Sequence, residues 1–404
     1  MEIWANFSGY TKLKCHSNQM EDIGTSSGSY SESLSELRII EGHMTSVLFE
    51  THHLYYLPNF APVIQELKKR GGFNISASIP QKMPKDEQEI FYDACSNLGI
   101  PVIKALNEED RIQKIQEENF DVILVGNVGQ LNYLTSKKTI TVMVYHGIGL
   151  KQSYYRDMDD RINIRSVESQ DRFDELKAKG HKNLVLTGFT KLDPLIDLDS
   201  EEVSRLGQDL GLDPDKKTIL YAPSFYPSSI ELLFPEFELL SINHNIIIKL
   251  HNFSWLQNRY RYQSKMAEAV DATCENVHLL KKEIFDIIPY YHLADILITD
   301  ISSTLFEFLP LNKPIIQANC YSLRLKHRIF SRRFWKKLDV KRMQNIDFTY
   351  PISNPSELSI RVQFALDFPE EMASLRKDAH DLYLFYPDGK ASSRLVDAIE
   401  SKLK

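Results

Sequence analysis

Short runs of apolar residues, separated by helical patterns, constrain the fold of this 404-residue chain more than any other feature. Residues 120–125 read FDVILV and residues 139–145 read TITVMVY. Runs that are apolar at almost every position indicate strands buried on both faces, because a solvated face would show alternating polar residues. Segments between them have helical spacing, such as residues 58–70, which end at Gly71-Gly72. This alternation predicts parallel sheets covered by helices on both faces.

The pattern divides into two successive halves. Strands are predicted at residues 46–51, 74–79, 100–104, 120–125, 139–145, 183–186, 218–222, 245–250, 277–279, 296–299 and 314–318. Helices are predicted at residues 58–70, 87–98, 108–118 and 391–403. The chain passes from one sheet to the next near residues 188–193, so we expect two Rossmann-like domains, residues 44–188 and 189–404, with a site between them. Whether the last helix packs back on the first domain stays open.

The first 43 residues differ from the rest of the chain. Residues 21–35 read EDIGTSSGSYSESLS, a Ser-rich polar composition that is typical of disorder. The Gly42-His43-Met44 junction resembles a cloning scar, with a mis-assigned upstream start as the other explanation. We therefore expect residues 1–43 to be a disordered or non-native extension.

Composition argues against several classes of function. The net charge of −7 argues against a general nucleic-acid binder. The four cysteines form no CxxC pair and no Cys/His metal spacing, which favours a reducing compartment. The sequence shows no apolar run long enough to span a bilayer and no signal peptide. We expect a cytoplasmic protein, soluble or bound peripherally to the inner face of the cell membrane.

Histidines follow two of the predicted strands, one in each half. The strand at residues 139–145 leads into HGIGLK, which begins at His146-Gly147 and ends at Lys151. The strand at residues 245–250 leads into His251, and Lys249 points the same way because side chains alternate along a strand. Histidine suits proton transfer near neutral pH. Each motif alone is more often an ordinary loop, and the histidines converge only if the halves face each other.

A run of hydroxyl residues follows the strand at residues 296–299. Asp300 comes first, then Ser302, Ser303 and Thr304, where a helical pattern begins. The first N–H groups of a helix lack internal partners and carry partial positive charge. A phosphate or diphosphate would bind well at such a turn. A simple helix cap is the alternative interpretation.

Two further strand ends carry residues of interest. Ser224 follows Pro223 after the strand at residues 218–222, and Gly188 permits a tight turn at the junction of the halves. Structural turns explain both about equally well.

These segments occur together and in this order, and the combination resembles the CDP-glycerol:poly(glycerophosphate) glycerophosphotransferases, which make teichoic-acid-type cell-wall polymers and related capsules. The matching stretches are HG with Lys151, GFTKLDPL, YAPS, IIKLH, DILITDISSTLFEF with Lys313-Pro314, and DGKAS followed by Arg394. The resemblance covers residues 44–404. It implies an α/β fold of GT-B type, in which two Rossmann-like domains with parallel sheets face a central cleft, the first for the acceptor and the second for the CDP donor.

The resemblance also implies an activity: transfer of glycerol phosphate from CDP-glycerol to a hydroxyl of a lipid-linked or polymeric acceptor, with release of CMP. His146 is then our choice of general base, and His251 would stabilise diphosphate charge or protonate the departing CMP. The implied donor-binding residues are Ser302, Ser303, Thr304, Asp300, Lys249, Ser224, Gly188 and Glu307. The implied acceptor- or phosphate-binding residues are Gly147, Lys151, Arg328, Arg332 and Arg333.

The chain departs from the family pattern at three positions. Ile301 stands where an aromatic residue is usual, Glu307 where aspartate is usual, and Asn252 replaces the proline of KLHP. The sequence establishes no requirement for a metal, because histidine and helix-end donors can neutralise a diphosphate without a cation. Residues 157–160 (DMDD) fit a solvated face better than a DxD metal site, so a divalent cation such as Mg²⁺ is kept only as an option.

Residues 324–342 (RLKHRIFSRRFWKKLDVKR) are strongly basic in an acidic chain, with aromatic residues interleaved. A basic amphipathic stretch binds anionic membrane surfaces, which would suit an acceptor held on a polyprenyl diphosphate lipid. The segment could instead grip the phosphates of a growing polymer, or pack its aromatics into the core.

Alternative functions stay open at this point. A nucleotide-sugar-dependent glycosyltransferase or epimerase shares the fold, but commonly has a Gly-rich loop where this chain has Thr51-His52-His53. A CDP-ribitol phosphotransferase would use the same chemistry with another alditol. A non-catalytic scaffold that binds acceptor lipid or polymer is a third reading, and the two histidines with the SST turn argue against it.

Overall fold

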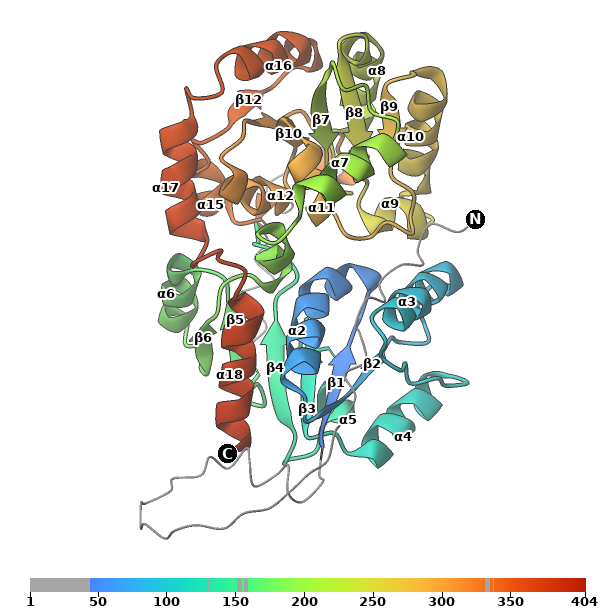
Figure 1. The fold of residues 1–404 in the computed structure, drawn as a ribbon, viewed down its shortest axis with the longest axis vertical. Coiled ribbons are helices and arrows are strands. Elements are labelled where there is room, and N and C mark those ends of the chain that lie inside the picture. Colours follow the sequence, from blue (N-terminus) through green and yellow to red (C-terminus); the bar gives the residue numbers. More distant parts are fainter. Residues whose placement is uncertain (1–43, 130, 151–154, 156–158, 331–334, 337) are drawn as a thin grey trace, which may run out of the picture. The chain divides into compact units, whose positions relative to one another are not determined.

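Two six-stranded parallel sheets form the frame of the protein (Figure 1). The structure, a computed structural model, describes residues 44–404 except 130, 151–154, 156–158, 331–334 and 337. The predicted N-terminal extension therefore lies outside the described residues, as do Lys151, Arg332, Arg333 and half of the DMDD segment, Asp157 and Met158.

The first sheet has the strand order β2-β1-β3-β4-β5-β6, with every neighbouring pair parallel. Its strands are β1 Thr45–Glu50, β2 Phe73–Ser78, β3 Val122–Val125, β4 Ile140–Val144, β5 Ile164–Val167 and β6 Leu184–Leu186. The helices of this half are η1 Leu54–Tyr56, α2 Leu57–Arg70, α3 Lys85–Asn97, α4 Glu108–Glu118, α5 Leu131–Leu134 and α6 Gln170–Ala178. Alternate residues of β1 enter two separate cores, Val47 and Phe49 on one face and Leu48 on the other. Both faces are thus buried, as the apolar runs predict.

The second sheet has the order β12-β11-β10-β7-β8-β9 and is also parallel throughout. Its strands are β7 Lys217–Tyr221, β8 His244–Ile248, β9 Val277–Leu279, β10 Ile296–Thr299, β11 Ile315–Ala318 and β12 Tyr350–Ile352. The remaining helices are η3 Thr190–Leu195, α7 Ser200–Asp209, α8 Ile230–Ser241, α9 Asn252–Leu256, α10 Arg261–Thr273, α11 Ile288–Leu293, α12 Thr304–Glu307, η4 Leu309–Leu311, α13 Leu325–Ile329, α15 Val340–Gln344, η5 Pro355–Glu357, α16 Leu358–Asp367, α17 Ala373–Tyr383 and α18 Ala391–Leu403.

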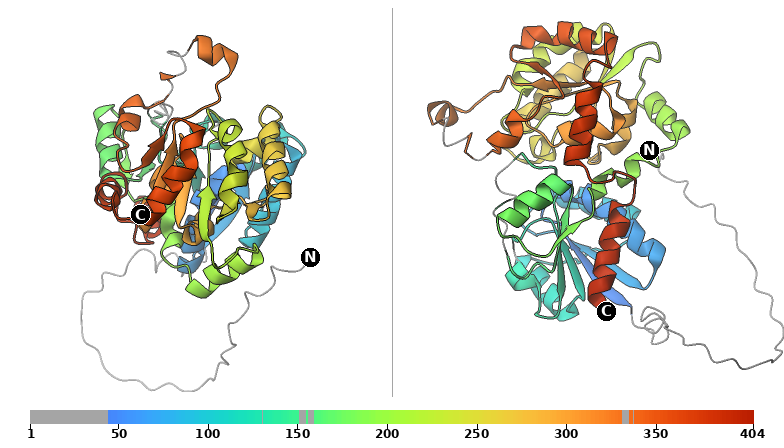
Figure 2. Two further views of the ribbon diagram at one scale, coloured as in Figure 1. Left: turned by 90° about the horizontal axis from the view of Figure 1, so that it is seen from above. Right: turned by 90° about the vertical axis from the view of Figure 1, so that its left-hand side faces the viewer.

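The last helix, α18, lies along the first sheet (Figures 1 and 2). Leu395, Val396 and Ile399 are fully buried in the same core as β1 and α2. The Asp193 carboxylate accepts the backbone N–H groups of Ala391 and Ser392 at 2.9 and 2.7 Å, which stabilises the start of α18. The chain therefore returns to the first half after completing the second. A boundary at residues 188 and 189 stays a prediction.

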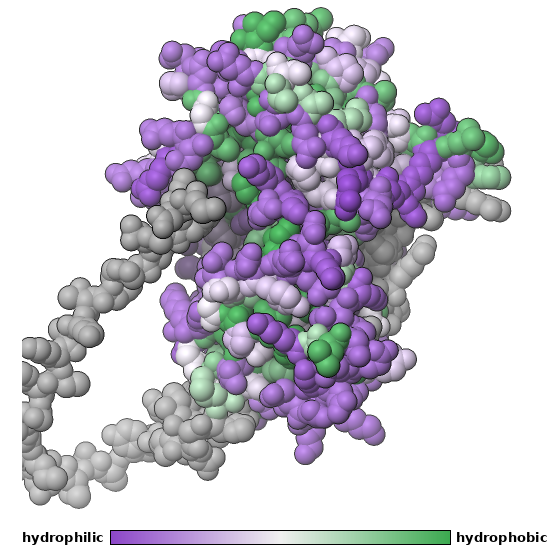
Figure 3. All heavy atoms as spheres, turned by 90° about the vertical axis from the view of Figure 1, so that its right-hand side faces the viewer, coloured by the Kyte–Doolittle hydropathy of each residue, from purple (hydrophilic) through white to green (hydrophobic). Residues whose placement is uncertain are grey.

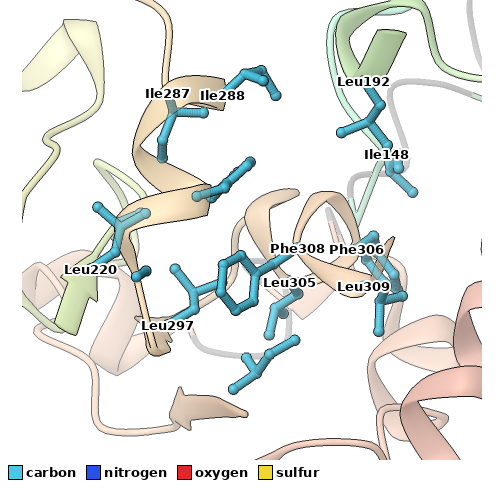
Figure 4. Packing of buried hydrophobic residues seen from close by; sticks show 14 of the residues in the cluster. Ile148, Leu192, Leu220, Ile287, Ile288, Leu297, Leu305, Phe306, Phe308 and Leu309 are labelled. Atoms are coloured by element: carbon cyan, nitrogen blue, oxygen red, sulfur yellow. The ribbon is translucent and has the colours of Figure 1, made fainter. Parts of the chain in front are cut away.

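The loop after β4 is anchored in the core of the second half (Figure 4). Ile148 is fully buried there with Leu297 and Phe306, and Leu192 of η3 joins the same cluster. Burying a leucine or isoleucine side chain stabilises a fold by roughly 1.5–3 kcal/mol. This shared core holds the HGIG segment against the second sheet.

Three details differ from the sequence-based expectation. Residues 100–104 form no strand; Val102 makes an isolated bridge to Ala77, and the neighbouring Pro101 has no N–H to extend a ladder. β5 and β12 carried no prediction. The buried Arg165 of β5 donates to the Tyr145 hydroxyl at 2.8 Å, so the strand lacks an apolar run, and β12 is three residues long with Pro351 at its centre.

Candidate functional site

The two predicted histidines contact the same aromatic ring. His146 follows β4 in the first half, and His251 follows β8 in the second. The ring of Tyr55, in η1 directly after β1, lies with its centroid 5.0 Å from that of His146 and 5.5 Å from that of His251. Since parallel strands end at the same edge, residues after β1 and β4 meet there, and the second half brings His251 to them.

Further aromatic rings surround both imidazoles. Tyr56 lies 4.6 Å from His146 between ring centroids, and Phe225 and Phe253 lie 4.7 and 5.1 Å from His251. Such packing limits ring rotation and water access around the histidines. Sequence reasoning missed these aromatic residues. The only sequence feature that could have indicated them is the Tyr55-Tyr56 pair, which follows a predicted strand. Two adjacent tyrosines form no motif that is specific for a functional site.

The hydrogen bond to His251 determines which of its ring nitrogens carries the proton. His251 is the N-cap of α9, and its Nδ1 accepts the backbone N–H of Phe253 at 3.1 Å. A nitrogen that accepts this bond has no proton, so the neutral ring carries its proton on Nε2. His251 is thereby arranged to donate a hydrogen bond from Nε2 and not to accept a proton there.

The turn after β10 engages its three hydroxyls within the protein. Ser303 donates to Glu307 at 2.7 Å, and the Thr304 hydroxyl lies 2.8 Å from that of Thr299. The Ser302 hydroxyl accepts the Thr304 N–H at 3.4 Å. Thr304 is buried, while Ser302 and Ser303 are partly exposed. The helix that follows, α12, is four residues long. The two serines are thus the members of the turn that a ligand can reach.

The carboxylate of Glu307 is the centre of a hydrogen-bonded network next to this turn. Its fully buried carboxylate accepts bonds from the Lys191 ammonium at 2.7 Å and from the Tyr291 hydroxyl at 2.9 Å, in addition to Ser303. Lys191 belongs to η3, the segment that connects the two sheets. It was part of a matching motif but was not predicted as a site residue. The network ties the connecting segment to the serine turn.

Lys249 lies close enough to Lys191 to be affected by its charge. Its buried ammonium donates to the carbonyl of Leu250 at 3.1 Å. Burial, followed by the positive charge of Lys191, lowers the pKa of Lys249 to about 8, against the opposing effect of Asp286. Two cations therefore lie near the end of β8 and the serine turn, where a diphosphate would lower the cost of their burial.

Asp300 serves the fold of the second half. Its fully buried carboxylate accepts the backbone N–H groups of Ser224 and Ser229 at 2.7 and 2.9 Å, and the Ser229 hydroxyl at 3.0 Å. The hydroxyl of Ser224 is itself occupied by the Pro227 carbonyl at 2.6 Å. Asp300 and Ser224 therefore fix the loop after β7, and any contact they make with a donor is through that loop.

We expect Asp300→Asn to lower the free energy of unfolding at pH 5 by about 1–3 kcal/mol. Both carboxyl oxygens of Asp300 accept hydrogen bonds, and an oxygen keeps a lone pair for this even when protonated, whereas the amide nitrogen of asparagine cannot accept one. Burial raises the pKa of Asp300 to about 7 from an ordinary value of 3.8. Between these values the folded protein retains a proton that the unfolded chain releases, so the wild type loses stability as the pH rises from about 4 to 7. The variant lacks this titrating group, so the difference in the free energy of unfolding between wild type and variant narrows as the pH rises.

Urea unfolding from pH 4 to 8 measures this difference. Asp381→Asn, which removes a carboxylate with 67% side-chain exposure, is the matched control and should follow the wild type. Parallel pH profiles for wild type and Asp300→Asn would contradict the prediction.

The other predicted site residues lie in different surroundings. Gly188 has φ of +90°, and a Cβ there would come within 2.7 Å of the Phe385 carbonyl, so its glycine serves the packing of the chain before α18. Gly147 is buried directly after His146. Arg328, on α13, donates to the Leu323 carbonyl at 2.7 Å.

A cavity of about 500 Å³ lies beside η3, lined by residues of α2, α11 and α18 among others. It contains Glu66, Asp193 and Asp286 but neither histidine nor the serine turn. Within the described ranges, no group of three His, Cys, Asp or Glu side chains is placed to hold a metal ion. Nor does any helix in that part of the chain have the length and apolarity needed to cross a membrane.

The chain is similar in sequence or in fold to several known proteins. The Teichoic acid poly(glycerol phosphate) polymerase of Bacillus spizizenii is 32% identical over 126 residues, and the match spans 29% of this chain and less than a third, 30%, of that protein. The Wall Teichoic Acid Polymerase TagF superposes with a TM-score of 0.65 at 16% identity, covering 91% of this chain and 92% of TagF; a histidine variant of TagF has also been solved after a CDPG soak. The UDP-GlcNAc 2-epimerase from Neisseria meningitidis, bound to UDP-GlcNAc, gives a TM-score of 0.58 at 15% identity, covering 89% of this chain and all of the epimerase chain (100%).

These structural likenesses confirm the predicted α/β, GT-B-like fold of two Rossmann-like domains. They do not by themselves separate a polymerase from an epimerase, since both carry it. A comparison with models of protein families distinguishes the two. Residues 122–401, more than half of the chain, match one such model. This chain therefore belongs to the CDP-Glycerol:Poly(glycerophosphate) glycerophosphotransferase family.

Proposed function

We propose that this chain transfers glycerol phosphate from CDP-glycerol to a hydroxyl of a lipid-linked or polymeric acceptor and releases CMP, in the synthesis of a teichoic-acid-like or capsular polymer. Family membership supports the reaction class. The observation that carries the proposal is the contact of both His146 and His251 with the ring of Tyr55, with the buried Lys249 and the partly buried Lys191 nearby.

In the proposed reaction the acceptor hydroxyl attacks the β-phosphorus of the donor, which bears the glycerol. A new P–O bond forms to the acceptor, and the bond to the bridging oxygen breaks so that CMP leaves with that oxygen. His146 takes the proton of the attacking hydroxyl. Phosphoryl transfer depends mainly on positioning and charge neutralisation.

We assign the second half to the donor. His251 would donate from Nε2 to a diphosphate oxygen, which favours charge stabilisation over proton donation to CMP, because loss of the Nε2 proton from a neutral ring would leave an imidazolate. Lys249, Lys191 and the two partly exposed serines, Ser302 and Ser303, would meet the remaining negative charge. In this proposal the protein groups alone neutralise the diphosphate, and dependence of turnover on added Mg²⁺ would show that they are not sufficient.

Product analysis with several donors tests the proposal. Purified chain is incubated with a glycerophosphate-terminated acceptor and CDP-glycerol, CDP-ribitol or a UDP-sugar. CMP release and acceptor extension with CDP-glycerol support the proposal. Preference for CDP-ribitol would correct the alditol, UDP release or sugar epimerisation would replace the reaction class, and binding of acceptor without turnover of any donor would favour a scaffold.

We also propose that α13 binds an anionic membrane surface. Leu325, Ile329 and Phe330 are 73%, 65% and 56% exposed, although they are large and apolar, and Lys326 and Arg328 lie between them in the sequence. The segment projects from the second half in Figure 2, and hydrophobic and hydrophilic side chains lie side by side on this projection in Figure 3. Exposed apolar groups next to cations match the headgroup region of such a surface.

A row of aromatic contacts links α13 to the candidate site. His327 lies 5.4 Å from Tyr226, Tyr226 lies 6.4 Å from Tyr260, and Tyr260 lies 5.0 Å from Phe225, all between ring centroids. Phe225 in turn contacts His251. A membrane-bound α13 would therefore place the site close to a lipid-linked acceptor.

Replacing Leu325, Ile329 and Phe330 by serine should reduce binding to phosphatidylglycerol-containing vesicles by about tenfold or more, because burial of even one large apolar side chain contributes roughly 1.5–3 kcal/mol. Co-sedimentation at low and high salt measures binding and its electrostatic part. Serine at Leu239 and Ile242, each 61% exposed on or beside α8, is the matched control. Unchanged binding of the α13 variant would contradict the proposal.

A further inference from the structure

A carboxylate–histidine pair lies after the end of β1, among residues that have not been assigned to the candidate site. His53 directly precedes η1, and its Nδ1 lies 3.1 Å from Oε1 of Glu87 on α3. The same oxygen accepts the backbone N–H of Leu54 at 2.9 Å. Glu87 is 2% exposed, whereas the His53 side chain is 24% exposed. The carboxylate is therefore fixed, and the imidazole remains accessible.

The pair determines the hydrogen-bonding character of His53. A carboxylate oxygen only accepts hydrogen bonds, so Nδ1 of His53 carries the proton in this contact. In the neutral ring, Nε2 is then an unprotonated acceptor. His251 has the opposite arrangement, with the proton on Nε2. One histidine is thus arranged to accept a hydrogen bond and the other to donate one.

The ring of His53 borders the candidate site. It stacks on Tyr55 with centroids 5.3 Å apart and an angle of 15° between ring planes, and it forms a T-shaped contact with Phe253 at 5.0 Å between centroids. Tyr55 also contacts His146 and His251, and Phe253 contacts His251. His53 therefore lies one ring away from each proposed catalytic histidine, on the half that we assign to the acceptor.

We propose that His53, held by Glu87, is a positioning residue that accepts a hydrogen bond from a hydroxyl of the acceptor next to the hydroxyl that attacks. The acceptor is then a polyol whose end carries two neighbouring hydroxyls, one for His146 and one for His53. This inference rests on the proposed function, because it assumes that an acceptor hydroxyl is the nucleophile. A hydroxyl donor suits an unprotonated Nε2, whereas a phosphate, which only accepts, does not.

A comparison of two acceptors and two substitutions tests this role. Synthetic acceptors ending in a vicinal diol or in its monodeoxy analogue are used with wild type, His53→Leu and His53→Gln. The wild type should have a KM for the diol about fivefold lower than for the analogue, since one good hydrogen bond contributes on the order of 1 kcal/mol. His53→Leu should abolish this preference with little change in the KM for CDP-glycerol. His53→Gln places an amide oxygen near the position of Nε2 and should restore part of it.

Controls separate this role from a structural one. His380→Ala removes another carboxylate-paired histidine, 2.8 Å from Asp381, and should keep the preference for the diol. Equal weakening of both acceptors by His53→Leu, or no effect on either, would overturn the proposal. Calorimetric binding of the two acceptors gives the same comparison without turnover. If the wild type binds the diol preferentially, His53→Leu abolishes that preference and neither protein transfers anything from CDP-glycerol, the proposed reaction fails while the hydrogen bond between His53 and the diol stands.

Discussion

Alanine in place of His146 should lower turnover with CDP-glycerol by about a hundredfold or more, because general base catalysis contributes a factor of roughly 10²–10⁴. The substitution removes the proposed proton acceptor from the attacking hydroxyl but leaves the second half, which we assign to the donor, untouched. The KM for CDP-glycerol should therefore change little while kcat falls. Initial rates of CMP release over a range of donor concentrations measure both quantities.

His146 also packs against Tyr55 and Tyr56, so a loss of activity needs to be separated from a local rearrangement. His146→Gln keeps most of the side-chain volume without a group that takes up a proton at neutral pH, and it should be as inactive as the alanine variant. His278→Ala, which removes a half-buried histidine on β9, should retain full activity. Turnover close to the wild-type level in either His146 variant would remove it from the proposed mechanism.

The frame of the protein could be predicted because its strands are buried on both faces. Residues 120–125 and 296–299 contain continuous apolar runs, and the structure confirms them as β3 and β10. β5 escaped prediction because it carries Arg165, whose burial depends on the Tyr145 hydroxyl supplied by a neighbouring strand. A hydrogen-bond partner from a neighbouring strand produces no periodic pattern in the sequence of the strand itself, so periodicity cannot reveal such a strand.

The sequence predicted which residues of the candidate site follow strands, but it did not predict how their side chains are arranged. That His146 and His251 follow strands can be read locally, and their contact with one ring depends on how the two halves pack. Side-chain directions in the SST turn depend on Glu307 and Thr299, so the sequence alone did not indicate that Thr304 turns inward. Tyr55 and His53 matter through neighbours that are distant in sequence, which periodicity cannot report.

His251 offers a substitution test in which the two ring nitrogens are removed separately. Asparagine places its amide near the position of Nδ1, and its oxygen can accept the Phe253 N–H and cap α9, as asparagine commonly does. Glutamine reaches the position of Nε2 and presents an N–H donor to the diphosphate. Because the proposed role is donation from Nε2, we expect His251→Asn to lower turnover by about a hundredfold or more, and His251→Gln to lower it by about tenfold.

The stability of the two variants should follow the opposite order. Loss of an N-cap costs about 1 kcal/mol, so His251→Gln should unfold at a lower urea concentration than His251→Asn although it is the more active protein. Opposite orders of activity and stability would be difficult to explain by general damage to the fold, since damage lowers both together. If asparagine preserved turnover and glutamine did not, the contribution of His251 would lie in capping α9, and a different group would have to stabilise the charge on the diphosphate.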